Sequence, residues 1–193
     1  MNEMTEKRGQ TCLNQVLSGN QKAFREFIGL YKKLVFSIAG KLVDNPDDLN
    51  DLCQEIFIKV YQNLSQFRGD SKISTWIGKI TYLSCLNYLR KKKSLITASI
   101  NDNVLNQETV QSIPPDQLAE NRDISLLLKQ EINNLPPRFR VALTLYHLDG
   151  LKYHELSEIM GLSEGTVKSH LFRARQLLKK RLLEKYQQEE LIS

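Results

Sequence analysis

The segment Leu151–Arg181, LKYHELSEIMGLSEGTVKSHLFRARQLLKKR, constrains the fold of this chain more than any other stretch. It predicts two helices joined by a tight turn at Gly161, because a residue without a Cβ adopts a positive φ at little cost. Ser163 is the expected N-cap of the second helix. At about 100° per residue, the apolar side chains of the second helix share one narrow face: Val167, Leu171, Ala174 and Leu178. The segment is therefore predicted to be a helix-turn-helix.

The opposite face of the second helix carries hydroxyl, amide and cationic groups. This side, with its flanks, consists of Lys168, Ser169, Phe172, Arg173, Arg175, Gln176 and Lys180. The major groove of DNA admits a helix, and side chains of these types read its base edges. An amphipathic hairpin with a solvated basic face is the alternative, but Phe172 on the polar side argues against it. We therefore predict a DNA-binding helix.

The distribution of charge predicts more than one partner. The 193 residues are 41% apolar and 25% charged, with a net charge of +5, which suits folded cores. Residues 164–185 contain seven Lys or Arg and two acids, and residues 66–93 contain seven and one, whereas residues 44–55 hold five acids and no base. Two basic patches predict two contacts with a polyanion, and the acidic stretch predicts a different partner.

The sequence shows no apolar run near the ~18 residues that span a membrane. Its N-terminus also lacks the apolar core of a signal peptide, so we expect a cytoplasmic chain without membrane insertion. Cys12, Cys53 and Cys85 are odd in number and far apart. That spacing favours buried thiols over a disulfide framework or a zinc site. We predict no metal site and no cofactor.

Helical periodicity dominates the chain and predicts an all-α fold. Helices are expected over residues 13–17, 22–43, 47–67, 74–92, 117–133, 138–148, 153–160 and 164–186. Residues 94–116 are polar, lack aromatics and end in a proline pair, which predicts a flexible linker. We therefore expect an N-terminal helical bundle (1–93), a linker (94–116) and a C-terminal helix-turn-helix domain (117–193).

The predicted helix over residues 47–67 has one apolar face for the core and one polar face. The polar face carries Asp51, Gln54, Glu55 and, among them, Ile58. A branched apolar residue inside an acid-and-amide patch favours a small protein-interaction surface. An incidentally exposed isoleucine explains the pattern equally well.

An enzymatic alternative exists for the start of the same helix. The string Asp47-Asp48-Leu49-Asn50-Asp51 resembles the aspartate-rich helices with which isoprenyl diphosphate synthases hold magnesium. Those enzymes need a second such helix, which this sequence lacks. We interpret Asp47 and Asp48 as charges that favour the helix N-terminus.

Residues 65–93 join a turn at Gly69 to a helix that mixes aromatic and basic side chains. Trp76, Ile80 and Leu83 share a face and are predicted to be core. Candidate contacts with nucleic acid are Phe67, Arg68, Lys72, Lys79, Tyr82, Tyr88 and Arg90, the cations for phosphates and the aromatics for unpaired bases. An ordinary amphipathic helix with a basic tail is the alternative.

From about Asn20 to Leu183 the chain resembles the extracytoplasmic-function sigma factors of bacterial RNA polymerase. GNQKAFREFIGLYKKLVFSIA is similar to the family's opening helices. DLNDLCQEIFIKVYQNLSQFRGDSKISTWIGKI is similar to its polymerase-binding helix and promoter-melting segment, and LPPRFRVALTLYHLDGLKYHELSEIMGLSEGTVKSHLFRARQLL to its fourth-region domain. The order and spacing of the three strings also match.

The resemblance implies roles for these residues. Asp51, Gln54, Glu55 and Ile58 would bind the β′ clamp helices of core RNA polymerase. Phe67, Arg68, Lys72, Lys79, Tyr82, Asn87 and Arg90 would serve the −10 element. Lys168, Ser169, Phe172 and Arg173 would read the −35 element, with Arg175 at phosphate and Gln176 and Lys180 on the same surface. The polymerase β flap, promoter DNA and an anti-sigma factor are the further implied partners, and the free chain is expected to be a monomer.

The chain departs from the family pattern at two positions. Leu83 stands where many members carry an asparagine of the −10 base pocket, so that contact is absent or moved. Asn87 matches a polar position one turn further along. His170 replaces a frequent arginine and is expected to be a flanking or phosphate-side group of the recognition helix, without a metal.

The sequence thus predicts a bacterial transcription initiation factor that binds core polymerase, directs it to −35/−10 promoters and melts the −10 element. It is not predicted to be an enzyme, because the sequence has no nucleophile–base pairing, glycine-rich phosphate loop or metal cluster. The alternative is a stand-alone helix-turn-helix regulator that binds duplex operators without polymerase. That alternative leaves the Ile58 patch and the aromatic-basic helix unexplained.

Overall fold

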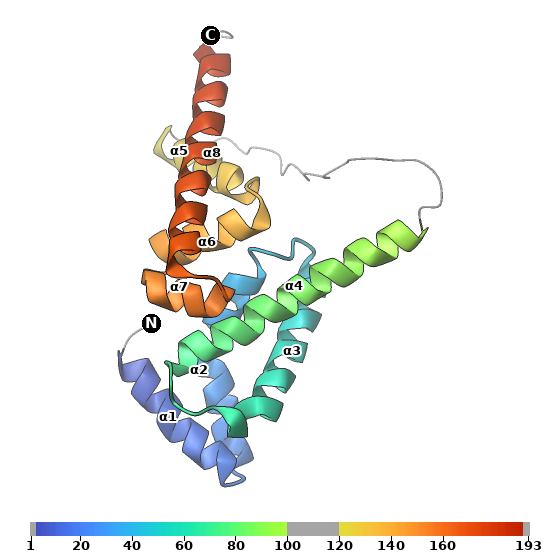
Figure 1. Cartoon of the computed structure of the whole chain (residues 1–193), viewed down its shortest axis with the longest axis vertical. Coiled ribbons are helices and arrows are strands. Elements are labelled where there is room, and N and C mark those ends of the chain that lie inside the picture. Colours follow the sequence, from blue (N-terminus) through green and yellow to red (C-terminus); the bar gives the residue numbers. More distant parts are fainter. Residues whose placement is uncertain (1–2, 100–119, 191–193) are drawn as a thin grey trace.

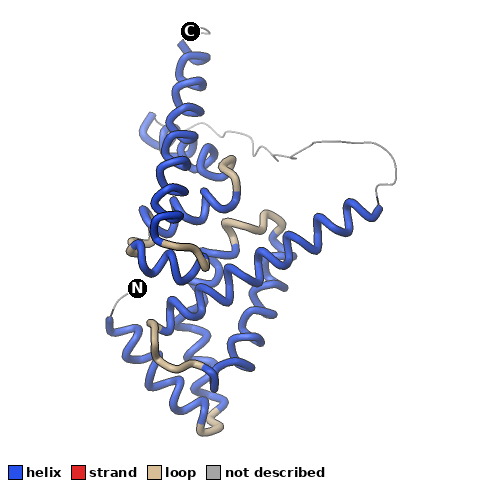
Figure 2. Tube along the Cα trace, in the orientation of Figure 1, coloured by secondary structure: helices blue, strands red, loops and turns tan. Residues whose placement is uncertain are grey.

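The computed structural model describes residues 3–99 and 120–190, and within them all regular structure is helical (Figures 1 and 2). The helices are α1 (Glu3–Leu17), α2 (Gln21–Ala39), α3 (Pro46–Asn63), the 3₁₀ turn η1 (Leu64–Gln66), α4 (Ile73–Ser99), α5 (Glu120–Asn133), α6 (Pro137–His147), α7 (Tyr153–Met160) and α8 (Glu164–Glu190). The predicted all-α fold is confirmed.

Short polar side chains fix where several helices begin. The Asn20 side chain accepts the backbone N–H groups of Lys22 and Ala23 at the start of α2. Asn45 does the same for Asp47 and Asp48, and Pro46 occupies the first turn of α3. Each cap satisfies donors that a helix N-terminus leaves without an intrahelical partner.

The turn between α7 and α8 forms as the sequence predicts. Gly161 ends α7 with a φ of 64°, in the left-handed region that glycine enters without strain. The Ser163 hydroxyl then accepts the Thr166 N–H at 3.2 Å and caps α8. These two residues fix the angle at which α8 leaves α7.

Several helices differ in length from the sequence prediction, and among them α3 ends at Asn63 rather than at residue 67 and α8 continues to Glu190 rather than to residue 186. The first begins at Glu3 rather than at residue 13, and α2 ends at Ala39, where the Gly40 N–H bonds back to Phe36 at 2.9 Å. Helix α4 continues to Ser99, so residues 94–99 of the predicted linker are helical. The rest of that linker, residues 100–116, lies outside the described residues.

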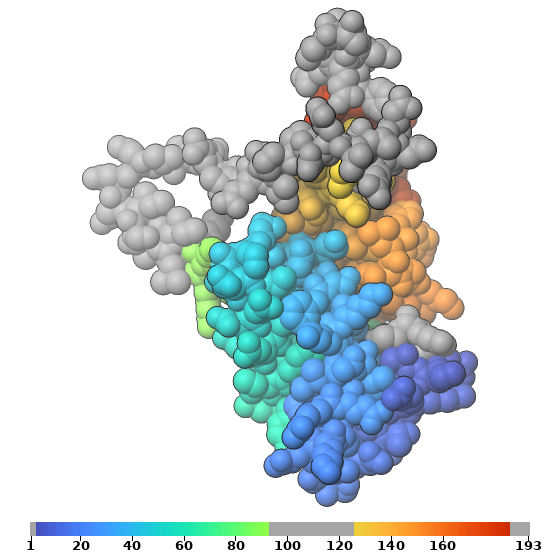
Figure 3. All heavy atoms as spheres, turned by 180° about the vertical axis from the view of Figure 1, so that it is seen from behind, coloured from blue at the N-terminus to red at the C-terminus, as the bar shows by residue number. Residues whose placement is uncertain are grey.

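Helix α4 is packed on two sides. It contacts α2 and α3 on one side and α7 on the other, and crosses the middle of the molecule in Figure 1. One hydrophobic core extends from α1–α4 into α6, α7 and the first turns of α8. A smaller cluster of Leu135, Leu143 and Ala174 joins α6 and α8 to the end of α5. From behind, the C-terminal helices lie directly on the N-terminal ones (Figure 3).

The structure tests two further predictions, that the cysteines are buried thiols and that the chain has no membrane-spanning helix. Cys12, Cys53 and Cys85 are buried free thiols, as predicted. Burial raises the pKa of Cys53 to about 11 and that of Cys85 to about 12, so both remain protonated and unreactive at neutral pH. Within the described ranges, none of the helices is long and apolar enough to cross a bilayer.

Candidate nucleic-acid and protein interfaces

The polar side of α8 forms a continuous exposed surface. Val167, Leu171 and Ala174 turn inward and are at most 1% exposed. All seven side chains predicted to contact DNA are exposed, and we call them the α8 polar face: Lys168, Ser169, Phe172, Arg173, Arg175, Gln176 and Lys180. Phe172 is 61% exposed, although the exposure of a large apolar side chain to water is unfavourable in free energy. A helix with this face outward can enter a groove of duplex DNA.

Two cations at the edge of this face rest on a pair of tyrosines that the sequence prediction missed. Tyr146 of α6 and Tyr153 of α7 stack with ring centroids 4.9 Å apart. The Lys168 ammonium lies 5.4 Å from the Tyr153 ring centre, and the Arg175 guanidinium 5.7 Å from that of Tyr146. We call these four residues the aromatic–cation column. The spacing of the tyrosines, seven residues across a turn, gave no signal for it.

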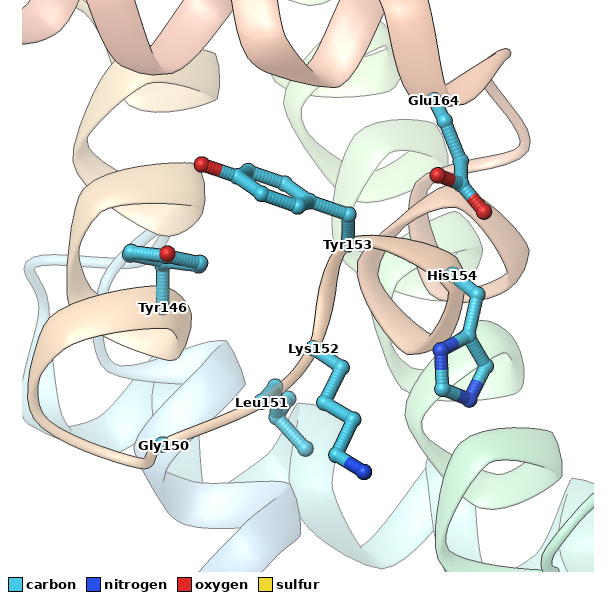
Figure 4. Close-up of a pocket in the computed structure, with 7 residues that line it drawn as sticks. All are labelled: Tyr146, Gly150, Leu151, Lys152, Tyr153, His154 and Glu164. Carbon is cyan, nitrogen blue, oxygen red and sulfur yellow. The ribbon is translucent and has the colours of Figure 1, made fainter.

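The column borders an open pocket of about 550 Å³ (Figure 4). Its lining residues are Tyr146, Gly150, Leu151, Lys152, Tyr153, His154 and Glu164, from α6, the following turn and the starts of α7 and α8. In Figure 4 the Lys152 and His154 side chains extend to the same side, away from the rings of Tyr146 and Tyr153. This concave edge next to the α8 polar face carries donors suited to phosphate oxygens.

His147 and His170 occupy the flanks of α8 in different ways. His147 accepts hydrogen bonds from the Arg175 guanidinium at 3.2 and 3.1 Å. His170 lies edge-on to Phe139, 5.4 Å between ring centres, and is half-buried. Burial lowers the pKa of both imidazoles, helped by Arg175 at His147 and by Arg138 and Arg173 at His170. His170 therefore lies on the flank of α8 that faces α6, which is one of the two positions that the sequence predicted for it.

The patch predicted on α3 is exposed. Asp51, Gln54 and Glu55 point to solvent, and Ile58 is 57% exposed among them. We call these four residues the α3 patch. Tyr61, one turn further and 53% exposed, was not predicted. The patch combines acceptors with an apolar centre, as a small protein interface does.

The start of α3 gives Asp48 partners within the protein. Its carboxylate accepts hydrogen bonds from the Tyr88 hydroxyl and, at 3.1 Å, from the Lys92 ammonium of α4. These bonds hold the pKa of Asp48 below its ordinary value. Tyr88, predicted as a stacking residue, is thus tied to α3. Among the described residues, no group of three His, Cys, Asp or Glu could hold a metal ion.

The residues predicted to contact the −10 element differ in exposure. Arg68, Lys72, Lys79, Asn87 and Arg90 are exposed, and we call these five the α4 basic surface. Phe67 is half-buried and packs against Trp76, 5.4 Å between ring centres. Tyr82 is buried at 2% exposure, so the prediction that it is free to stack on a base does not hold in this conformation.

The predicted core face of α4 is wrong at one position. Leu83 is 44% exposed, whereas its neighbour Tyr82 is buried. The buried residues of α4 include Ile73, Ile77 and Cys85 together with the hydroxyl residues Ser74, Thr81 and Ser84. Because α4 is covered on two sides, its buried surface is wider than one apolar stripe and includes small hydroxyl side chains.

Comparisons with known proteins agree with this architecture. Residues 27–95 match the family described as Sigma-70 region 2, and residues 125–178 match Sigma-70, region 4. The chain is 35% identical to the ECF RNA polymerase sigma-E factor of Escherichia coli K12, over 88% of this chain and 91% of that protein. It is 28% identical to the ECF RNA polymerase sigma factor SigW of Bacillus subtilis 168, over 94% and 98%.

Solved structures share the fold. The structure of CnrH in complex with the cytosolic domain of CnrY superposes with a TM-score of 0.64 at 19% identity, over 91% of this chain and 97% of that one. The sigma factor RpoE of Bartonella quintana, in complex with the anti-sigma factor NepR, gives 0.63 at 23% identity, over 83% and 97%.

Proposed function

The chain belongs to the extracytoplasmic-function family of RNA polymerase sigma factors. We propose which of its exposed surfaces bind promoter DNA and which binds core polymerase. It is a transcription initiation factor that directs RNA polymerase to promoters. Three surfaces are available for this role: the α8 polar face, the α4 basic surface and the α3 patch. In this proposal the chain acts by binding alone, in the cytoplasm where core polymerase is found.

We assign the −35 element to the α8 polar face. Lys168, Ser169, Phe172 and Arg173 read base edges, while Arg175 and Lys180 contact phosphates and Gln176 contributes a further polar contact. This face carries the assignment, because all seven of its side chains are exposed while Val167, Leu171 and Ala174 behind them are at most 1% exposed. A bidentate arginine contact with guanine discriminates against other bases by about 1–3 kcal/mol.

We assign the −10 element to the α4 basic surface together with Phe67. The cations neutralise the backbone of the opened strand, and the half-buried ring of Phe67 offers a stacking surface for a base. Leu83 is exposed where many relatives carry an asparagine, and Asn87 lies exposed one turn further along. We therefore place the polar base contact of this chain at Asn87.

We assign core polymerase to the α3 patch. Ile58 is the apolar centre, and Asp51, Gln54 and Glu55 supply acceptors around it. A surface of this kind suits a basic, partly apolar helical partner such as the β′ clamp helices. An anti-sigma factor is a further candidate partner, as in the Bartonella complex.

The test is co-elution of the chain with bacterial core RNA polymerase. Wild type is expected to co-elute stoichiometrically and to support transcription from a matched promoter. Ile58→Asp is expected to abolish both, because it places a charge at the apolar centre of the interface. Leu17→Asp is the matched control, since Leu17 is 53% exposed against 57% for Ile58 and lies on α1.

Two results would contradict the proposal. If Ile58→Asp binds core polymerase as tightly as wild type, the α3 patch is not the polymerase surface. If wild type does not co-elute with core polymerase but binds duplex DNA tightly by itself, the chain acts as a stand-alone regulator.

A further inference from the structure

A second open pocket lies between α1 and the segment that leads into α4. Its volume is about 480 Å³, which falls within the range of about 300–1,000 Å³ that is usual for small-ligand sites. Glu6, Lys7 and Gln10 of α1 line one side, and residues between Phe67 and Ile73 line the other. Figure 1 shows this segment passing beside the first turns of α1. The α1 side of the pocket belongs to none of the three surfaces assigned above.

Two contacts restrict how α1 lies on the rest of the N-terminal bundle. A Cβ at Gly9 would overlap the hydroxyl of Tyr31, a fully buried residue of α2, so α1 approaches α2 closely at this glycine. The Glu6 carboxylate accepts backbone N–H groups at the start of α4. Because both Glu6 and Gly9 are held, the rotation of α1 is fixed, and so is the side of the helix that lines the pocket.

Two polar side chains of the lining have no partner within the protein. Across the residues that the structure describes, neither the Gln10 amide nor the Asp70 carboxylate makes a hydrogen bond or an ion pair, and both side chains are exposed. Asp70 follows Gly69, where a φ of 80° turns the segment. An amide from α1 and an acceptor from the opposite side are therefore available to a ligand.

The two lysines of the lining already have partners but keep much of their exposure. Lys7 pairs with Glu3 at 3.1 Å, and Lys72 donates to Glu155 of α7 at 2.6 Å. The side chains of the two lysines are 77% and 53% exposed. Both cations therefore still attract the backbone of a nucleic acid toward the pocket.

The pocket has an aromatic surface beside these polar groups. Phe67 is half-buried, and its ring packs against Trp76 with 5.4 Å between ring centres, so the ring is held in place. An unpaired base stacks on an aromatic ring whatever its identity, because every base has a π face. Phe67 therefore retains a base without selecting it, and selection falls to Gln10 and Asp70.

The chemistry of these two groups favours a base with an exocyclic amine. A carboxylate only accepts hydrogen bonds, so Asp70 needs a donor, which the N4 amine of cytosine or the N6 amine of adenine provides. The Gln10 amide can donate to the ring nitrogen next to that amine. Thymine and guanine present a carbonyl oxygen in place of the amine, which a carboxylate repels. A phosphate, as an anion, is disfavoured beside Asp70 for the same reason.

We propose that α1 forms one wall of a base-reading site, in which Gln10 and Asp70 select an unpaired adenine or cytosine that stacks on Phe67. The inference rests on the −10 role proposed for the α4 basic surface and Phe67. It adds Gln10, from the first helix of the chain, to the residues that determine which promoters are bound.

The first experiment measures the base preference. Core RNA polymerase reconstituted with the full chain selects promoters from a duplex library in which the −35 and −10 elements are randomised. Wild type is expected to enrich adenine or cytosine at one −10 position that is unpaired in the open complex. With Asp70→Asn, whose amide both donates and accepts, the preference over thymine and guanine should fall at least about fivefold at that position only.

The second experiment tests the α1 wall. Promoter fork DNA with a single-stranded −10 element carries each of the four bases at the selected position, and its binding to the holoenzyme is measured by fluorescence anisotropy. Gln10→Leu removes the amide, so affinity for the preferred base should fall about two- to tenfold, the usual effect of a lost hydrogen bond, and affinity for thymine should fall less. Gln15→Leu is the matched control, because Gln15 is an exposed glutamine of the same helix that does not line the pocket. Circular dichroism melts report whether each variant is folded.

Three results would overturn the inference. Thymine or guanine could be enriched at the position that Asp70→Asn alters. Asp70→Asn could leave every base preference unchanged. Gln10→Leu could lose no more affinity than Gln15→Leu, which would leave the α1 wall without a role in reading the base. Failure of the proposed function looks different, because then the holoenzyme with wild-type chain would select no promoter from the library.

Discussion

The Glu6 carboxylate accepts the backbone N–H of Ile73 at 3.1 Å, although the two residues lie 67 positions apart. Its second oxygen accepts the N–H of Ser74 at 3.3 Å. Glu6 of α1 therefore caps the N-terminus of α4, where the segment containing Phe67 and Arg68 joins the helix. A capping carboxylate also favours the positive end of the helix dipole. The cap positions the segment that we assign to the −10 element.

We predict that Glu6→Ala lowers the free energy of unfolding by about 0.5–2 kcal/mol, the usual effect of removing a helix cap. It should also weaken binding of a single-stranded −10 oligonucleotide, because the segment before α4 loses its anchor. Urea unfolding and fluorescence anisotropy measure the two effects. Glu3→Ala is the control, since Glu3 is exposed and pairs with Lys7 in the same helix. Equal effects of both substitutions would rule out a capping role.

The aromatic–cation column supports a second prediction. Tyr146→Leu keeps the bulk of the side chain but removes the ring beneath Arg175 and the stacking partner of Tyr153. An exposed cation–π contact contributes about 0.5–1 kcal/mol, so affinity for −35 duplex DNA should fall about two- to fivefold. Tyr61→Leu on α3 should leave that affinity unchanged. Unchanged binding by Tyr146→Leu would show that Arg175 is positioned without the ring, for example by His147 alone.

Much of this fold follows from local patterns, and the exceptions have physical causes. The bounds of α7 were predicted correctly because Gly161 and the short apolar pattern are local signals. The cap of α4 by Glu6 was not predictable, since nothing in the sequence links residues so far apart. Leu83 was predicted to be buried and Tyr82 to be exposed, and both are the reverse, because the prediction assumed a single apolar stripe on α4. Thr81, whose hydroxyl donates to the Ile77 carbonyl at 2.8 Å, is buried although it lies outside that stripe.

The surfaces were predictable to a similar degree. Exposure of the α8 polar face and of Ile58 followed from helical periodicity alone. Burial of Tyr82 depends on α4 being covered from both sides, and helix periodicity cannot show which parts of a two-domain chain pack together. Pairing of Lys72 with Glu155 depends on the same contact. The errors therefore concentrate where the two halves meet.

The imidazoles of His147 and His170 give a third prediction. Both have a pKa below 6.5 in the folded chain, so between those lowered values and 6.5 the unfolded chain binds more protons. Their contribution to stability is complete above 6.5 and is lost as the pH falls toward the folded values. Urea unfolding at pH 7.5 and pH 5.5 should show lower stability at the acidic pH. His170→Gln should reduce this difference, and an undiminished difference would place its origin elsewhere.

Substitution of Arg173 and of Lys180, both on the α8 polar face, should affect promoter binding in different ways if their roles are as proposed. Removing a base contact relaxes specificity at one position, so Arg173→Ala should cost about 1–3 kcal/mol at a single base pair of the −35 element. Removing a phosphate contact weakens binding to all sequences alike, so Lys180→Ala should reduce the slope of log affinity against log salt by about 1. Titrations of polymerase holoenzyme with each variant, over a set of −35 substitutions and three salt concentrations, separate the two. Lys180 also pairs with Glu184 at 3.7 Å, so Glu184→Gln serves as the control for loss of that pair. If Arg173→Ala instead weakens every sequence equally and lowers the salt slope, the arginine lies at phosphate and the base contact belongs to a neighbour on the same face.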